Sequence, residues 1–368
     1  MGKKTAAAFD PRYVSLDHWR GVAALAVVLF HGFGSARIVH LVVHPSIAWL
    51  KALSDYGWLG VDLFFVISGY CIAANLYRMA CSNLGSWGFF RDRLFRIYPT
   101  YWVACILAIA LNTVAAPFNH VSLADNLPAN WTAALGDVLL VEPYLHTAPF
   151  LLVSWTLVYE LGFYLLAAFG YALWRRGINL YGLFVVAIGL AVWGLWGVPW
   201  LGGYVLQLWP EFLCGGVVFF CLWLKNLRPS IALWPLVILL GFAILGNILP
   251  LPGQRCLEMT LAAAFACLLV LLHPYDGQIA RWRSLHWLAW VGTISYSLYL
   301  THTLFMGKVI NLVSRRIAAD SLFQLPLQLI GWLAAILGAW LIFKFCEQPL
   351  ECWRHSMRRR STSVLRHK

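Results

Sequence analysis

The stretch WLGVDLFFVISGYCIAANLYR, residues 58–78, decides the fold class of this chain. Its 21 residues are almost all apolar, and Asp62 and Arg78, one near each end, are its only formal charges. A helix of that length rises about 30 Å, which is the thickness of the hydrocarbon core of a bilayer. The stretch therefore predicts a transmembrane helix rather than a helix in the core of a soluble domain.

Similar apolar segments of about 17 to 25 residues recur along the whole chain. Of the 368 residues, 61% are hydrophobic and 11% are charged, and the mean hydropathy is +0.72. This composition is typical of a polytopic membrane protein and excludes an ordinary soluble domain. We therefore predict an all-α integral membrane protein with about ten transmembrane helices. The predicted segments are residues 19–38, 58–78, 97–116, 153–174, 180–199, 203–224, 231–250, 258–273, 287–311 and 325–346.

Lysine and arginine residues gather on one side of these segments. Twenty of the 27 lie in the N-terminal stretch, in alternate loops and near the C-terminus. By the positive-inside rule, this asymmetry predicts that both termini are cytoplasmic. Residues 1–350 then form a single transmembrane domain, and residues 351–368 form a basic cytoplasmic tail. The net charge of +12 is mainly a topology signal, so we expect the lipid bilayer as a partner and no nucleic acid.

A few acidic or imidazole side chains interrupt the apolar segments, where each is costly unless it faces a partner or a cavity. They are His31, Asp62, Glu160, Glu211 and His302. At 1.5 Å per residue, all but Glu211 fall in the outer half of the membrane, and His31 lies roughly 16 Å from Arg20 at the inner end of its segment. The sequence thus predicts one layer of proton-transferring groups.

A basic run lies at the inner side, in FFRDRLFRIYPTYW, residues 89–102. Arg91, Arg93 and Arg96 immediately precede a predicted helix whose first turn carries Pro99, a position that favours proline. Arginines can bind phosphate oxygens with forked hydrogen bonds, and a helix N-terminus adds its dipole. A positive-inside anchor is the alternative interpretation, and the run alone leaves both open.

Together these motifs resemble the membrane-bound acyltransferases of family three. The likeness covers nearly the whole chain and rests on six motifs. They are LDHWRGVAALAVVLFH (16–31), WLGVDLFFVISGY (58–70), FFRDRLFRIYPTYW (89–102), SWTLVYELGFY (154–164), VGTISYSLYLTH (291–302) and EQP (347–349). The family acylates surface polysaccharides, lipopolysaccharide O-antigen, lipochitin oligosaccharides and some small molecules. The resemblance implies an enzyme of the bacterial inner membrane that moves an acyl group, usually acetyl, from cytoplasmic acyl-CoA to a hydroxyl.

The resemblance also implies roles for particular residues. Arg20, Arg93 and Arg96 would bind the donor and His31 would be catalytic, and Arg91 joins the donor set as part of the same run. Asp92 stands where the family often has a basic residue, which leaves the exact phosphate partner open.

The chemistry of ester formation explains why these residue types are suitable. A sugar hydroxyl is a poor nucleophile, and an imidazole with a pKa of about 6.5 can remove the hydroxyl proton as the oxygen attacks a thioester. We predict His31 as this base, with Glu160 as the first candidate to orient it and Asp62 as the second. His302 would donate to the developing oxyanion or bind the acceptor.

Two other functions are the alternatives, and they differ in whether they would use the buried ionisable groups. A proton-coupled transporter or flippase of a polysaccharide precursor or small molecule would use them as a relay, and a structural membrane protein would need none of them. No internal repeat typical of transporters is evident, and the nine cysteines show no zinc or disulfide spacing. We therefore expect no metal and no tightly bound cofactor, with acyl-CoA as the donor substrate. The acceptor, the acyl chain length and the oligomeric state stay open.

Overall fold

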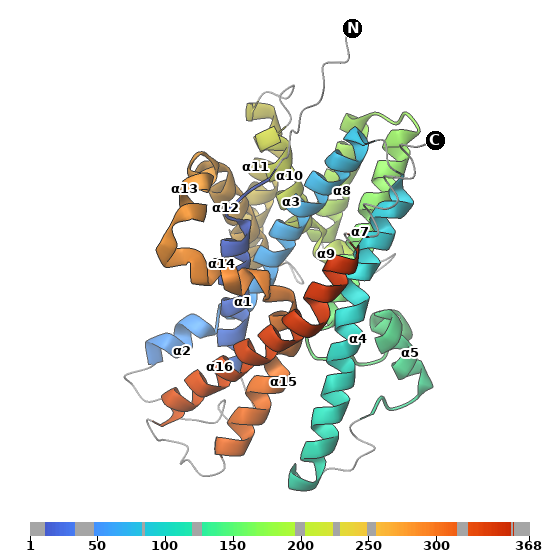
Figure 1. Ribbon diagram of the computed structural model, residues 1–368. Helices are drawn as coiled ribbons and strands as arrows, with labels where there is room; N and C mark the ends of the chain where they lie inside the picture. The colour runs from blue at the N-terminus through green and yellow to red at the C-terminus, as the bar shows by residue number, and fades with distance from the viewer. Residues whose placement is uncertain are drawn as a thin grey trace. The chain divides into compact units, whose positions relative to one another are not determined.

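The computed structural model describes residues 12–33, 48–82, 85–119, 127–195, 203–223, 229–248, 255–314, 323–354 and 356. Every regular element in this part of the chain is a helix (Figure 1). A helix overlaps each of the predicted segments, although residues 34–38, 196–199, 224 and 249–250 of those segments lie outside the described residues. These helices are α1 (Leu16–Phe33), α3 (Gly60–Cys81), α4 (Ser86–Asn119), α7 (Trp155–Arg175), α8 (Leu180–Leu195), α10 (Trp209–Trp223), α11 (Pro229–Ile248), α12 (Cys256–Leu272), α15 (Ser295–Ser314) and α16 (Gln324–Ile342).

Shorter helices fill the connections. They are α2 (Ala48–Ser54), α5 (Trp131–Leu139), α6 (Glu142–Leu145), α9 (Gly203–Gln207), α13 (Asp276–Arg281) and α14 (His286–Thr293), with a π-helical turn, η6 (Phe343–Glu347), after α16. Within the described residues, five helical stretches are long and apolar enough to cross a membrane: Ala48–Cys81, Ser86–Pro117, Trp155–Arg175, Cys256–Arg281 and Leu325–Arg354. The predicted all-α membrane protein is confirmed at this level, whereas ten crossings and cytoplasmic termini stay predictions.

Helix α4 begins eleven residues before the predicted start at residue 97. The prediction that the arginine run precedes this helix was wrong, because Arg91, Arg93 and Arg96 lie on α4 itself and Pro99 is an interior residue. A proline removes one backbone hydrogen bond, which a long apolar helix tolerates. The surrounding Phe, Leu and Arg residues permit the helix to continue on both sides.

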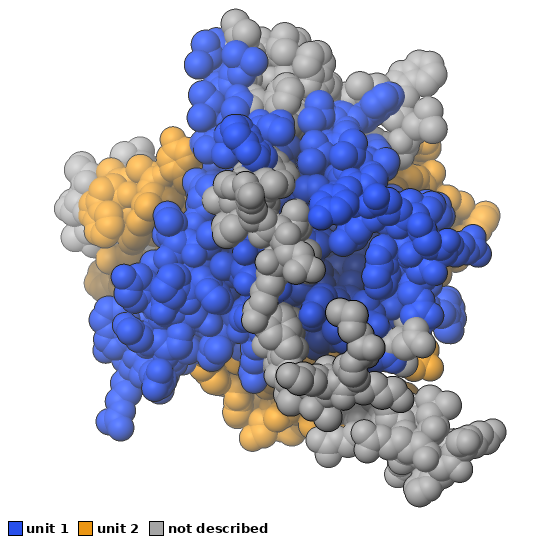
Figure 2. All heavy atoms as spheres, turned by 90° about the horizontal axis from the view of Figure 1, so that it is seen from above, with its two compact units in different colours: residues 1–19, 62–89, 163–289 blue, residues 20–61, 90–162, 290–368 orange. Residues whose placement is uncertain are grey.

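The chain divides into two compact units, which Figure 2 shows in different colours. The first unit comprises residues 1–19, 62–89 and 163–289, and the second comprises residues 20–61, 90–162 and 290–368. In the first unit, α10 packs against α8, α11 and α12. A Cβ atom at Gly69 of α3 would lie 2.0 Å from the Phe212 carbonyl oxygen, and one at Gly215 of α10 would lie 1.9 Å from that of Val66. In a membrane, lipid is as apolar as the side chains, so helices associate largely through close backbone packing at small residues such as these glycines.

In the second unit, α15 and α16 pack side by side (Figure 1). Aromatic side chains of α4 hold the segment that contains α5. The Tyr98 hydroxyl donates to the Leu139 carbonyl oxygen at 2.7 Å, and the Tyr101 hydroxyl donates to that of Asp137 at 2.8 Å. Between the predicted segments 97–116 and 153–174, the described residues therefore include two short helices, and the segment that contains α5 lies against α4.

Two carboxyl groups are buried within this segment. Glu142 is 1% exposed, and its Oε1 accepts a hydrogen bond from the Ser154 hydroxyl at 3.4 Å. Burial raises the pKa of Glu142 to about 7, and the nearby Asp137 carboxylate contributes to the rise. Burial also raises the pKa of Asp137, although a hydrogen bond from the Phe150 backbone N–H at 2.8 Å opposes this shift. Both groups therefore hold their protons more tightly than exposed carboxyls do.

Candidate active site

Two of the predicted catalytic residues meet in the second unit. His31, near the end of α1, and His302, on α15, approach through Nδ1 of His31 and Nε2 of His302 at 3.1 Å. The ring centroids are 4.9 Å apart, and the planes are inclined by 61°. His302 is 0% exposed. The structure thus brings together two groups that the sequence had placed only at a similar depth.

The hydrogen bonds of this pair fix which nitrogens carry protons. His302 Nδ1 lies 3.0 Å from the Leu298 carbonyl oxygen and 2.8 Å from that of Tyr299. Carbonyl oxygens only accept, so this nitrogen is protonated, and in the buried neutral ring Nε2 holds a lone pair. His31 Nδ1 faces that lone pair and, at 3.0 Å, the Val27 carbonyl oxygen, so it must donate. In the neutral ring of His31, Nε2 is then unprotonated, as a general base requires.

Tyr299 connects the histidine pair to α7. A hydrogen bond of 2.9 Å joins its hydroxyl to that of Thr156 in the first turn of α7. Glu160 lies one helical turn further along α7, on the same face as Thr156, and interacts electrostatically with Tyr299. Through Tyr299, the structure places Glu160 in the surroundings of His302. Its predicted role as the group that orients His31 stays a prediction.

The arginine run divides between two faces of α4. Arg93 and Arg96 are three positions apart and share a face, whereas Arg91 is exposed and about 200° from Arg93 around the helix. The Tyr296 hydroxyl of α15 donates to the Ile97 carbonyl oxygen at 2.8 Å, so α15 is attached to α4 next to Arg96. His302 lies six residues further along α15, a rise of about 9 Å.

A buried carboxylate also lies at this junction. Glu347, at the end of η6, is 8% exposed and accepts a hydrogen bond from the Ser297 hydroxyl at 2.5 Å. It interacts electrostatically with Arg96. The terminal EQP motif thus contributes to the surroundings of the arginine that the sequence predicted as a donor ligand.

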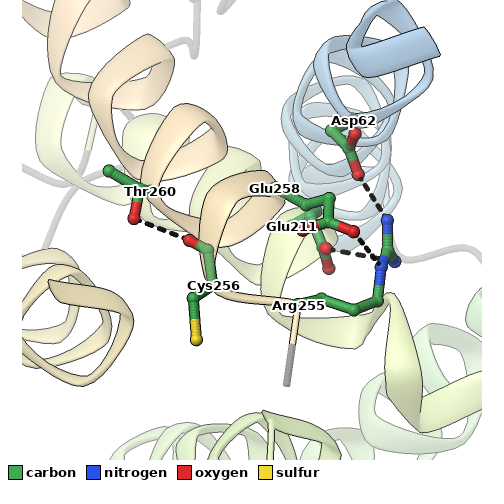
Figure 3. Close-up of polar contacts among 6 residues, drawn as sticks. All are labelled: Asp62, Glu211, Arg255, Cys256, Glu258 and Thr260. Atoms are coloured by element: carbon green, nitrogen blue, oxygen red, sulfur yellow. Dashed lines mark hydrogen bonds and ion pairs between the residues drawn. The ribbon is translucent and has the colours of Figure 1, made fainter. Parts of the chain in front are cut away.

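Asp62 belongs to the other compact unit, where it takes part in an ionic cluster (Figure 3). Arg255, just before α12, pairs through Nη2 with Asp62 Oδ1 at 3.0 Å, through Nη1 with Glu211 Oε1 at 3.4 Å and through Nε with Glu258 Oε1 at 3.0 Å. Asp62 and Glu211 are each 1% exposed. Buried carboxylates need such a partner, so this cluster provides a structural reason for both acids. The predicted role of Asp62 beside His31 stays untested.

Arg20, the remaining predicted donor ligand, is partly buried on α1. It precedes His31 by eleven positions, about 16 Å along the helix. Their placement at different depths in the membrane stays a prediction.

Sequence reasoning missed Tyr299 and Thr156. A signal for Tyr299 was present, because it precedes His302 by three residues and so lies on the same helical face. No such signal pointed to Thr156, because its hydrogen bond to Tyr299 depends on the packing of α7 against α15. Among the described residues, no three His, Cys, Asp or Glu side chains are grouped to hold a metal ion.

This geometry and the comparisons with known proteins define the class of the chain. The model of a family described as an acyltransferase domain matches residues 13–344, so the chain belongs to this family and is an acyltransferase. It is similar to the exopolysaccharide production protein ExoZ of Rhizobium meliloti (strain 1021), with 29% identity over 259 residues, covering 67% of this chain and 76% of ExoZ. It is also similar to the peptidoglycan O-acetyltransferase OatA of Listeria monocytogenes, with 27% identity over 203 residues, covering 50% of this chain and 29% of OatA. No solved structure matches the chain.

Proposed function

We propose that this acyltransferase moves an acetyl or related acyl group from acyl-CoA to a hydroxyl of a glycan, with His31 as the general base. The observation that carries the proposal is the hydrogen bond between His31 and His302, because it leaves the Nε2 lone pair of His31 available to a substrate hydroxyl. His302 then acts as a positioning residue that holds His31 in the reactive tautomer.

The reaction balances without an enzyme-bound acyl intermediate. His31 Nε2 takes the hydroxyl proton as the oxygen attacks the thioester carbonyl carbon. The new C–O bond forms, the C–S bond breaks, and the protonated His31 returns its proton to the departing thiolate. Because His31 is a cation during the transfer, the Nδ1–H bond to His302 becomes charge-assisted and is then strongest. The pair therefore stabilises the transition state more than the ground state.

The arginines supply the donor side of the proposal. Coenzyme A carries its phosphates at one end and its thioester at the end of a long flexible arm. Arg93 and Arg96 lie on one face of α4, and the attachment of Tyr296 to Ile97 connects that face to the helix carrying His302. We propose that the phosphates bind at this face, with Arg20 as a further ligand, while the arm extends toward the histidine pair.

The setting of the reaction follows from the chemistry of its substrates. Acyl-CoA is made in the cytoplasm, and the printed names of the relatives refer to exopolysaccharide and peptidoglycan. We propose a multi-pass protein of the bacterial inner membrane, with both termini and the phosphate site on the cytoplasmic side and a polysaccharide or its lipid-linked precursor as acceptor.

One experiment tests the donor and the reaction together. Membranes containing the protein are supplied with acetyl-CoA labelled in the acetyl group, with and without oligosaccharide acceptors. Label should appear in ester linkage on the acceptor only when both substrates and wild-type protein are present. Acceptor acetylation from a different acetyl donor, with no use of acetyl-CoA, would overturn the donor assignment.

A further inference from the structure

Arg354 is an arginine that sequence reasoning assigned to the basic tail, yet the structure packs it against α4. Helical conformation continues through η6 to Arg354. The ring centroids of Trp353 and Phe95 are 5.9 Å apart, and Arg354 Nη1 donates to the Asp92 carbonyl oxygen at 3.3 Å. Two adjacent residues thus contact α4 within one turn, all inside the second compact unit.

This contact places two guanidinium groups near each other. The Asp92 carbonyl points along α4 toward Arg96, and Arg354 and Arg96 repel each other electrostatically. Two acidic residues lie beside this pair: Glu347, which interacts electrostatically with Arg96 and accepts from Ser297, and Glu351, which is 3.7 Å from Arg354 Nη2 and 41% exposed. Two like charges held together by the fold are stabilised by an anion that contacts both.

The hydrogen-bonding capacity of Arg354 also points to an anion. A guanidinium has five N–H donors. The side chain of Arg354 is only 17% exposed, and its Nε atom is buried without a hydrogen-bond partner in the described part of the chain. A buried donor without an acceptor is costly, so this group is suited to bind one that enters the site.

We propose that Arg354 binds a phosphate group together with Arg96, and that this phosphate is one of those of the acyl-CoA donor. The inference rests on the proposed function, and it adds to the donor site a residue from beyond the end of α16. A phosphate of an anionic lipid headgroup shares this chemistry and is the other possible source.

The test compares purified full-length wild type with Arg354→Gln in lipid nanodiscs. Isothermal titration measures coenzyme A affinity, first in phosphatidylcholine alone and then with phosphatidylglycerol added. The variant should bind coenzyme A roughly ten- to hundredfold more weakly in both lipids, as expected for a lost charge-assisted contact. Glu351→Gln is the matched control: it removes the neighbouring ion pair but no donor, so affinity should be unchanged or tighter.

A kinetic comparison separates phosphate binding from a change in shape. Acetyl-pantetheine carries the thioester without phosphates, so its transfer rate should be equal in wild type and Arg354→Gln. Equal coenzyme A affinity in the folded variant and the wild type would overturn the donor assignment of Arg354 and leave the proposed function intact. Loss of retained phosphatidylglycerol instead, measured by native mass spectrometry, would assign the site to a lipid headgroup. Wild type that binds no coenzyme A would overturn the proposed donor as well.

Discussion

Replacing His302 with phenylalanine tests how the histidine pair works. The ring volume is kept, but the acceptor 3.1 Å from His31 Nδ1 is removed. In the resting state the N–H of His31 still has the Val27 carbonyl oxygen at 3.0 Å, so the loss there is about 1 kcal/mol or less. When His31 is protonated, the missing bond is charge-assisted and worth about 1.5 to 3 kcal/mol.

The larger loss falls on the transition state, so turnover should fall roughly ten- to hundredfold. The KM for acetyl-CoA should not change, because the arginines that bind it are untouched. His302→Gln should recover part of the rate, since an amide oxygen can accept the His31 N–H. Steady-state kinetics of acetyl transfer on folded variants measure all of these. Wild-type turnover in His302→Phe would refute the reasoning, and so would a Gln variant that is as slow as Phe.

Three further predictions concern other parts of the chain. Arg93→Ala or Arg96→Ala should weaken coenzyme A binding by about 1.5 to 3 kcal/mol in titration calorimetry, and lysine should restore only part of it because it lacks the planar fork; unchanged affinity would make the run an orientation anchor. Gly215→Ala should destabilise the protein by about 1 to 3 kcal/mol or more in thermal unfolding, because its Cβ would lie 1.9 Å from the Val66 carbonyl oxygen. Gly216→Ala, whose Cβ would meet nothing within 4 Å, is the matched control and should leave stability nearly unchanged. In the folded state the pKa of Glu142 is about 7, so the stability that this group contributes is present below about pH 4.5 and is lost as the pH rises through 7. In Glu142→Gln the free energy of unfolding should fall less over this pH range, by about 1 to 3 kcal/mol. An identical pH dependence in the two proteins would contradict this prediction.

The helical membrane architecture was predictable because hydropathy is a local property of the sequence. An apolar stretch such as residues 58–78 has few stable alternatives to a helix in lipid. The start of α4 was not predictable from the same rule. Pro99 is typical of a first helical turn, but the cost of an interior proline was outweighed by the helix-forming residues around it.

The candidate site was predictable by depth but not by contact. His31 and His302 could be assigned to one layer from their distance to the segment ends, while their hydrogen bond depends on how α1 and α15 pack. The predicted partner Glu160 is a carboxylate, the usual group that orients a histidine. The structure shows another imidazole hydrogen-bonded to His31 Nδ1. No pattern in the sequence distinguishes these two possibilities.

Arg354 shows a different limit of sequence reasoning. Its neighbours Arg358, Arg359 and Arg360 make the stretch look like an orientation signal, which places the whole tail in water. The helix continues through the π-helical turn at Phe343–Glu347, and the tilted ring contact between Trp353 and Phe95 accompanies the packing of Arg354 against α4. Such turns have no sequence signature that sets them apart from an ordinary helix end.

Acetyl transfer by His31→Ala tests the central claim most directly. The account predicts a folded protein with wild-type affinity for coenzyme A and a transfer rate lower by about 10²- to 10⁴-fold, the usual contribution of a positioned general base. Titration calorimetry and labelled acetyl transfer, made on the same preparation, measure both quantities. A folded His31→Ala protein that transfers acetyl groups at close to the wild-type rate would contradict the account.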